Sequence, residues 1–261
     1  MSAEKIVRIG GASGFWGDSR VAAPQLVASG QVDYLVFDYL AETTMAILAG
    51  ARLKRPELGY ATDFVDVAMR SVLGELAAKK IKVVSNAGGI HPRACVAALE
   101  KMIAEAGLAL KVAVVEGDDV SAQIAALAAA GTRDLASGAP LPARVVSANA
   151  YLGALPIAAA LAAGADIVVT GRVVDSALAL GPLMHEFGWS ATDFDRLAAG
   201  SLAGHIIECG CQATGGLHTD WESVPDWPNI GYPVVECRAD GTFLVDKPPA
   251  TGGLVNTATV G

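Results

Sequence analysis

The sequence predicts an α/β protein with a doubly wound, mainly parallel sheet. Apolar β-branched runs alternate with helical patterns, the runs are apolar on both faces, and 261 residues suffice for a large core. A (β/α) barrel is the alternative, although six strand–helix units fall short of the eight that a barrel needs. We therefore expect an open sheet with helices on both faces.

The strands are expected where β-branched and other apolar residues cluster. In chain order these runs are Ile6–Ile9, Asp33–Phe37, Ile81–Ser85, Leu110–Val115, Ala143–Ser147 and Ile167–Thr170. The helices are expected at the Ala- and Leu-rich segments Val21–Ser29, Glu42–Arg52, Ala61–Lys79, Arg93–Ala106, Ser121–Ala130 and Pro156–Ala163. The glycines suited to helix C-caps are Gly30, Gly107, Gly131 and Gly164.

The composition changes after residue 208. Residues 209–233 are rich in Gly, Pro and Trp, which predicts a long loop over the sheet, of the kind that often binds ligands or forms a lid. Asp240-Gly241 between two apolar runs then predicts a β-hairpin. We therefore divide the chain into an α/β domain, residues 1–208, and an extension, residues 209–261. A helix start at Leu254–Val260 with nothing behind it indicates that the extension continues in a longer parent protein.

Composition and charge restrict the partners. The net charge is −8 without a basic block, which argues against nucleic acid. No apolar run is long enough for a membrane span. Only 18% of residues are charged and 52% are hydrophobic, so we expect part of the surface to be covered in a homo-oligomer. Four cysteines, and a Met1–Lys5 segment without signal-peptide features, favour a cytoplasmic protein with reduced thiols.

The ends of the predicted strands carry polar groups. In a parallel sheet, ligand-facing residues follow the carboxyl ends of the strands. These segments are Gly10–Asp18, Asp38–Glu42, Asn86–Pro92, Glu116–Asp119, Asn149–Tyr151 and Gly171–Ser176. We expect them to converge on one site, with Gly14, Asp38, Asn86 and Arg172 as neighbours.

The binding groups follow from this arrangement. The turn Gly11-x-x-Gly14-x-x-Gly17 lies between a strand and a helix, where free N–H groups can hold an anion. Arg172 can pair with a carboxylate or phosphate. The expected substrate-binding residues are Gly11, Ser13, Gly14, Phe15, Trp16, Asn86, Gly88, Asp118, Asn149 and Arg172.

Proton transfer has several candidate groups. The expected catalytic residues are Asp38, Glu42, His91, Asp175 and Cys209, with Asp38, Glu42 and Asp175 as alternatives for the proton-transfer group. Ordinary roles compete with these, because Asp118 and Asp175 precede helices that they could cap, and Pro92 places His91 at a helix start. Arg172 could also pair with Asp175 alone, three residues on.

A metal site is not expected. Zinc-type residues occur at His205, Cys209, Cys211 and His218. Their spacing matches neither Cys-x2–4-Cys nor His-x3–5-His pairs.

A nicotinamide-dependent oxidoreductase is an alternative function. The glycine turn, Asp38 some twenty residues later and Asn86-Ala87-Gly88 all resemble short-chain dehydrogenases. That family uses Tyr-x-x-x-Lys for proton transfer, and none of the tyrosines has a lysine four residues later. An NAD(P) cleft without hydride-transfer residues, or a non-catalytic ligand-binding subunit, therefore stays as an alternative.

Motifs along the whole chain resemble the acyclic terpene utilisation family of AtuA type. In order they are Arg8–Asp18, Asp33–Glu42, Val84–Gly89, Gly171–Ala177, Glu208–Gly216 and Thr251–Gly253. The resemblance implies a role in bacterial breakdown of citronellol- and geraniol-like terpenes, on a branched acid or acyl-CoA, with lyase or hydratase chemistry. Coenzyme A would then be the carrier of a small-molecule acyl substrate, and no other cofactor is implied.

The sequence departs from the family pattern in two respects. Cys211 replaces a small residue and His218 stands where the family has no histidine, which further weakens a metal site. Family members also run beyond the equivalent of Gly261, so residues that complete the site are expected to lie outside this sequence.

Overall fold

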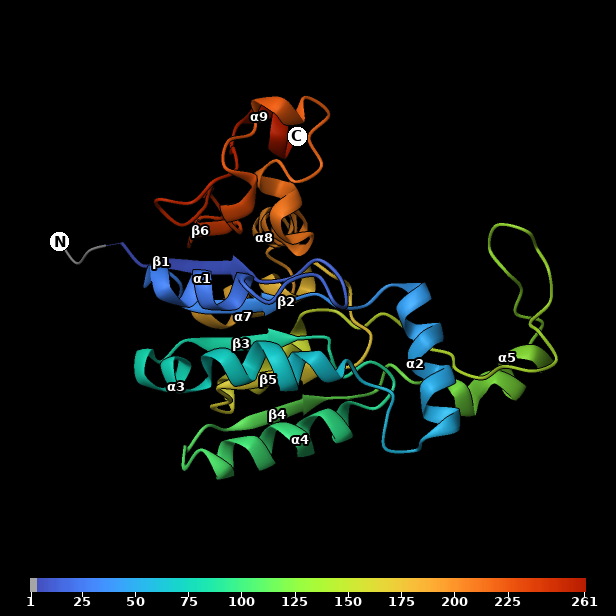
Figure 1. Cartoon of the computed structure of the whole chain (residues 1–261). Coiled ribbons are helices and arrows are strands. Elements are labelled where there is room, and N and C mark those ends of the chain that lie inside the picture. The colour runs from blue at the N-terminus through green and yellow to red at the C-terminus, as the bar shows by residue number, and fades with distance from the viewer. Residues whose placement is uncertain (1–3) are drawn as a thin grey trace.

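Seven strands form one open sheet in the computed structural model, which describes residues 4–261 (Figure 1). The strand order is β4-β5-β3-β2-β1-β6-β7, with β1 to β5 parallel and the β6–β7 hairpin antiparallel. The predicted α/β class is therefore confirmed, and the barrel alternative is wrong because the sheet does not close. Residues 1–3 of the Met1–Lys5 segment lie outside the described residues.

The strands match the predicted runs except one. They are β1 (Ile6–Gly11), β2 (Tyr34–Phe37), β3 (Lys82–Ser85), β4 (Val112–Val115), β5 (Ile167–Thr170), β6 (Val234–Arg238) and β7 (Phe243–Asp246). The run Ala143–Ser147 is not a strand, and its prediction was wrong. Pro140 and Pro142 precede this run, and, among the described residues, the pairing beside it is limited to two isolated bridges, Arg133 with Pro140 and Asp119 with Asn149.

The helices connect these strands. The α-helices are α1 (Ala22–Ser29), α2 (Glu42–Lys54), α3 (Arg70–Lys79), α4 (Pro92–Glu105), α5 (Ile124–Ala129), α6 (Leu155–Ala162), α7 (Ala177–Phe187), α8 (Phe194–Glu208) and α9 (Thr257–Val260). A π-helix, η1 (Phe64–Met69), precedes α3, and short 3₁₀ turns are η2 (Ser121–Gln123), η3 (Gly210–Thr214), η4 (Trp221–Ser223) and η5 (Trp227–Asn229). The predicted helix Ala61–Lys79 is thus a π-helix followed by an α-helix. The predicted C-cap glycines Gly30, Gly107, Gly131 and Gly164 all adopt positive φ.

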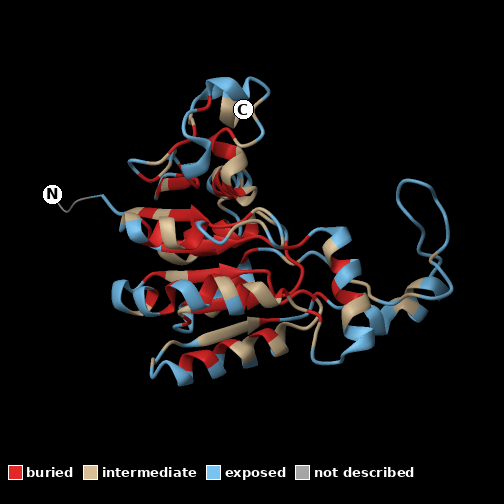
Figure 2. Ribbon diagram, in the orientation of Figure 1, coloured by how far each residue is buried: buried red, intermediate tan, exposed pale blue. Residues whose placement is uncertain are grey.

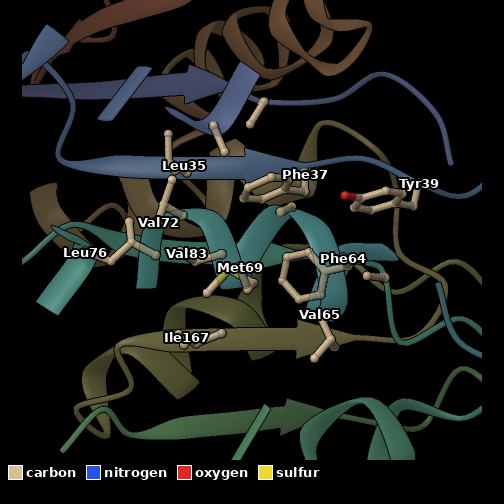
Figure 3. Close-up of a cluster of buried hydrophobic side chains, with 14 of the residues drawn as sticks. Leu35, Phe37, Tyr39, Phe64, Val65, Met69, Val72, Leu76, Val83 and Ile167 are labelled. Atoms are coloured by element: carbon tan, nitrogen blue, oxygen red, sulfur yellow. The ribbon is translucent and has the colours of Figure 1, made fainter. Parts of the chain in front are cut away.

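Two cores lie on opposite faces of the sheet. The residues of β2 alternate between them: Leu35 and Phe37 pack with α1, α3 and α4, whereas Tyr34 and Val36 pack with α6, α7 and α8. Figure 3 shows the first core, where the ring of Phe64 from η1 packs edge-on against the ring of Phe37. Both faces of the central strands are buried (Figure 2), as a parallel sheet between helical layers requires.

The change of face defines a switch point. The chain leaves β3 toward α4 on one face and leaves β5 toward α7 on the other, although β3 and β5 are neighbours. The loops after these two strands therefore diverge and leave a crevice at the carboxyl edge of the sheet, the usual ligand site of such folds.

Two segments project beyond this edge. Helix α2 and an arm, defined here as residues 119–150 with α5, extend from the carboxyl ends of the strands in Figure 1. The extension 209–261 instead adds the hairpin to the sheet through the β1–β6 pairing. Within the described chain, every helix is too short or too polar to cross a membrane.

Candidate functional site

The carboxyl ends of β2, β3 and β5 bring Asp38, Asn86 and Arg172 into one polar cluster. The Asn86 side chain donates to Asp38 Oδ1 at 2.7 Å, and the Leu40 N–H donates to the same oxygen at 3.2 Å. Asn86 Oδ1 in turn accepts from the Tyr39 N–H at 2.8 Å. The site therefore forms at the switch point. The ends of these three strands converge there, as the sequence predicted.

Asp38 is a buried carboxyl group, with 5% of the residue exposed. Burial raises the pKa of Asp38 to about 7, the negative charge of Asp175 adds to the rise, and the hydrogen bond from Asn86 opposes it. A carboxyl group with this pKa can both give and take a proton near neutral pH, which is the property of a general acid–base.

Three carboxylates face one another in this cluster. Oxygen atoms of Asp38, Asp175 and Glu208 all lie within 4.8 Å of one another. Burial also raises the pKa of Glu208, the last residue of α8. Its Oε1 lies within hydrogen-bonding distance of His205 Nδ1, at 2.9 Å. Three carboxylates this close together can share protons. Their oxygen atoms are also of the kind that could hold a divalent cation.

Arg172 balances the charge of these carboxylates. Its Nη1 lies 2.6 Å from Asp175 Oδ1, and its Nη2 lies 3.7 Å from Glu42 Oε1. The ring of Tyr151 stacks on the guanidinium at 4.2 Å, and the Tyr151 hydroxyl donates to Glu42. The Arg172 side chain is 6% exposed but that of Glu42 is 81% exposed, so a solvent-facing carboxylate occupies the outer side of a buried arginine.

Asp118 fixes the loop that carries Arg172. Its Oδ2 accepts from the Arg172 N–H and from the Asn149 side chain, each at 2.8 Å. A Cβ on Gly171 would lie 2.5 Å from this carboxylate, so the loop approaches Asp118 at a distance that only glycine permits. Asp118 and Asn149 therefore position Arg172. Asp118 caps no helix, contrary to one of the sequence-based alternatives.

The glycine turn after β1 makes its contacts with other parts of the same chain. The N–H groups of Gly11, Ala12 and Gly14 donate to Pro233 O, Val36 O and the Asp18 carboxylate. A Cβ on Gly11 would lie 2.3 Å from Ile207 O, and one on Gly14 would lie 2.6 Å from the backbone of Cys209.

These glycines permit α8 to pack on the turn. Gly11 and Gly14 therefore face the protein's own backbone at the place where an open anion cradle and, for the NAD(P) alternative, a pyrophosphate site were expected. Ser13, the remaining polar residue of the turn, donates its hydroxyl to Asp38 O at 3.0 Å and thus supports the cluster.

The other predicted residues lie apart from the cluster. His91 precedes α4 with Nδ1 3.1 Å from Leu58 O, Phe15 is 52% exposed, and Trp16 lines a separate cavity of about 260 Å³. Cys209 does border the cluster. Burial and the neighbouring carboxylates raise the pKa of its thiol, which opposes the thiolate that nucleophilic catalysis needs.

Gly88 packs closely rather than facing a ligand. A Cβ there would lie 2.5 Å from Thr170 O, so Gly88 lets the β3 and β5 loops come together. Glu208 and Tyr151 were missed as site residues. Glu208 ends a helix and follows no strand, although it stands in the motif Glu208-Cys209-Gly210.

The fold and the site define a doubly wound α/β protein with a buried carboxylate–arginine cluster at its switch point. The family model of acyclic terpene utilisation family protein AtuA matches residues 7–261, nearly the whole sequence, and the chain belongs to this family. The family implies a role in acyclic terpene utilisation. Neither the curated proteins nor the solved structures contain a significant match.

Proposed function

We propose that this protein is a lyase or hydratase that removes water from, or adds it to, a branched acid or its coenzyme A thioester. The observation that carries the proposal is Asp38, a buried carboxyl group whose pKa is raised to about 7 and whose oxygens face Asp175 and Glu208 beside Arg172. Reversible hydration needs proton transfer at two neighbouring carbons and a cation for the carbonyl oxygen. The cluster offers groups for each.

Asp38 takes the proton in the dehydration direction. It removes a hydrogen from the carbon next to the carboxyl or thioester group, and the electron pair left on that carbon forms the double bond. The hydroxyl group on the next carbon leaves with the proton of Glu208, whose pKa burial raises, so that the products are water and the unsaturated acid. Hydration is the reverse.

Arg172 binds the carbonyl oxygen or carboxylate of the substrate. Glu42 now lies on the outer Nη2 of Arg172, at 3.7 Å and largely in solvent, so its contribution to the pairing is small. A substrate carboxylate can replace Glu42 there, while Asp175 and Asp118 keep the arginine in place. The charge that develops on the carbonyl oxygen in the transition state would meet a desolvated guanidinium.

The test is turnover of geranoyl-CoA and geranate by the full chain, followed by the loss of the conjugated double bond. We expect Asp38→Asn to lower kcat by about 10²–10⁴-fold, with geranate affinity in calorimetry unchanged. In the dehydration direction kcat/KM should pass through a maximum with pH, because Asp38 must be ionised to take a proton whereas Glu208 must be protonated to give one. Full activity of Asp38→Asn would overturn the proposal.

The same experiment separates two further functions. A non-catalytic binding subunit would bind geranate through Arg172 and yield no product with the wild-type chain. A cation-dependent enzyme, which the three clustered carboxylates favour, would lose turnover in a chelator and regain it with Mg²⁺ or Mn²⁺.

A further inference from the structure

A second cavity, of about 260 Å³, lies apart from the carboxylate–arginine cluster. We call it the Trp16 cavity. The β1–α1 turn supplies Trp16 and Arg20 to its walls, the segment after β2 supplies Tyr39, and η1 and the residue before it supply Val67 and Asp63. Drug-sized ligands occupy sites of about 300–1,000 Å³, so this cavity suits a smaller molecule.

Two aromatic rings form one wall of the Trp16 cavity. Trp16 is half-buried, and Tyr39 is only 3% exposed. The ring of Tyr39 stacks on Phe37 with the centroids 6.2 Å apart and meets Phe64 edge-on at 5.9 Å (Figure 3). A wall held in this way suits an apolar side chain, and the faces of aromatic rings also attract a cation.

Asp63 places a negative charge beside these rings that the protein compensates incompletely. Within residues 4–261, its Oδ1 is closed off from solvent and has no hydrogen-bond partner. Burial raises the pKa of this carboxyl group, whereas the Trp16 indole and the N–H groups of Gly17 and Phe64 oppose the rise. Buried polar atoms without a partner are rare, so a ligand that brings a positive charge would stabilise this carboxylate. Asp63 also precedes η1, and π-helical turns are frequent at functional sites.

Arg20 brings a positive charge to the same cavity. It is exposed, and it forms no ion pair with any residue that the structure describes. Arg20 and Asp63 thus line one cavity with opposite charges and do not pair with each other. Asp18, the other carboxylate near Tyr39, already accepts from the Gly14 N–H at 2.9 Å. The cavity therefore offers a carboxylate and a guanidinium to one small molecule.

We propose that the Trp16 cavity binds a small zwitterion, an α-amino acid with an apolar side chain. The ammonium group of the amino acid pairs with Asp63, and its carboxylate pairs with Arg20. Its side chain packs against the aromatic wall. The inference goes beyond the proposed function, because no residue of the carboxylate–arginine cluster lines this cavity.

Calorimetry with matched probes tests the two charges. L-Alanine, L-valine and L-leucine are each compared with the amine that lacks the carboxylate and with the acid that lacks the ammonium group. For L-leucine these two probes are isoamylamine and isocaproate. The wild-type chain should bind at least one of the amino acids about tenfold more tightly than its amine, because the amine loses the charged contact with Arg20. Failure of all three amino acids to bind would overturn the proposal.

Two variants remove the two charges one at a time. Asp63→Asn should weaken both the amino acid and its amine about 10- to 100-fold, whereas Arg20→Gln should reduce the amino acid to the affinity of its amine. Asparagine keeps the shape of aspartate and Arg20 is exposed, so both variants should fold, as circular dichroism will show.

Asp66→Asn and Arg70→Gln are the matched controls. Both residues are exposed, and neither lines the Trp16 cavity, so these variants should bind the amino acids like the wild type. Unchanged amino-acid affinity in Asp63→Asn or in Arg20→Gln, or an equal loss in the controls, would overturn the proposal.

Arg172→Gln distinguishes the Trp16 cavity from the carboxylate–arginine cluster. Carboxylates can also bind at Arg172, so L-leucine and isocaproate are compared in this variant. Amino-acid binding should be unchanged, whereas an acid that binds at the cluster should be lost. Loss of amino-acid binding in a folded Arg172→Gln chain would overturn the Trp16 cavity as the site. Retained amino-acid binding without any turnover of geranoyl-CoA by the wild type would support the cavity and contradict only the proposed function.

Discussion

At the scale of single residues, Asp38 makes stability depend on pH. The pKa of Asp38 is about 7 in the folded protein and 3.8 as the unperturbed value. Between these two pH values, Asp38 is therefore protonated in the folded chain and ionised in the unfolded chain. The free energy of unfolding therefore falls as pH rises from about 4 to 7 and levels off above. At about 1.4 kcal/mol per pKa unit, the loss is on the order of 4 kcal/mol at most.

We expect Asp38→Asn to remove this loss. The side-chain oxygen of the introduced asparagine can still accept the bonds that Asn86 and Leu40 now donate, whereas the charge repelled by Asp175 and Glu208 is gone. The variant should be more stable than the wild type above pH 7, and the difference should shrink toward pH 4 in urea denaturation. Glu100→Gln, on the exposed face of α4, controls for the loss of one charge. An equal difference at every pH would contradict the raised pKa.

At the scale of elements, the β1–α1 turn depends on close packing against α8. A Cβ on Gly14 would lie 2.6 Å from the Cys209 backbone, which cannot yield as a flexible side chain can. We expect Gly14→Ala to destabilise the protein by about 1–3 kcal/mol through overpacking. Gly74→Ala, at an open position inside α3, should instead stabilise it by about 0.5–1 kcal/mol. Urea midpoints measure both, and equal midpoints for the two variants would refute the packing argument.

The same turn shows why sequence patterns predict the fold more readily than they predict the functional site. Period and β-branching identify strands such as Ile167–Thr170 because both faces of the sheet must be covered. The pattern of Gly11 and Gly14 is equally clear, but glycine permits a close approach of any backbone, and here the approaching chain is α8.

Glu208 is a site residue that no sequence pattern predicted. Its place beside Asp38 follows from the packing of α8 over β1, which brings together two residues 170 positions apart in the sequence, and no local pattern encodes this contact. The strand ends predicted Asp38, Asn86 and Arg172 as neighbours because the sheet itself aligns those ends, but the same reasoning placed His91 in the site, and His91 lies apart from it. For Ala143–Ser147 the pattern fitted a strand, but no sheet edge lies beside it, since the chain there returns along the arm.

At the scale of the whole molecule, the arm has no core of its own. None of residues 121–149 is buried, although the segment is rich in Ala, Leu and Val, and Leu135 is fully exposed. Ordering each residue costs about 1–2 kcal/mol in backbone entropy, which burial within this chain does not offset. Contact with a second copy would supply that burial.

Charge favours the same pairing. The arm carries Asp119, Arg133, Asp134 and Arg144, a net charge of zero, so the rest of the chain carries the whole net charge of −8. An apolar arm without net charge can approach the acidic body of another copy without the repulsion that two acidic bodies would experience. We therefore propose a homo-oligomer joined through the arm.

Light scattering after size exclusion tests this assembly. The wild-type chain should have the mass of a dimer or larger oligomer at micromolar concentration, and Leu135→Asp should shift it to the monomer mass of 26.6 kDa with unchanged circular dichroism. Phe194→Asp, at another exposed apolar side chain on α8, should leave the mass unaltered. A monomeric wild type would refute the arm contact, whereas dissociation by Phe194→Asp alone would move the interface to α8.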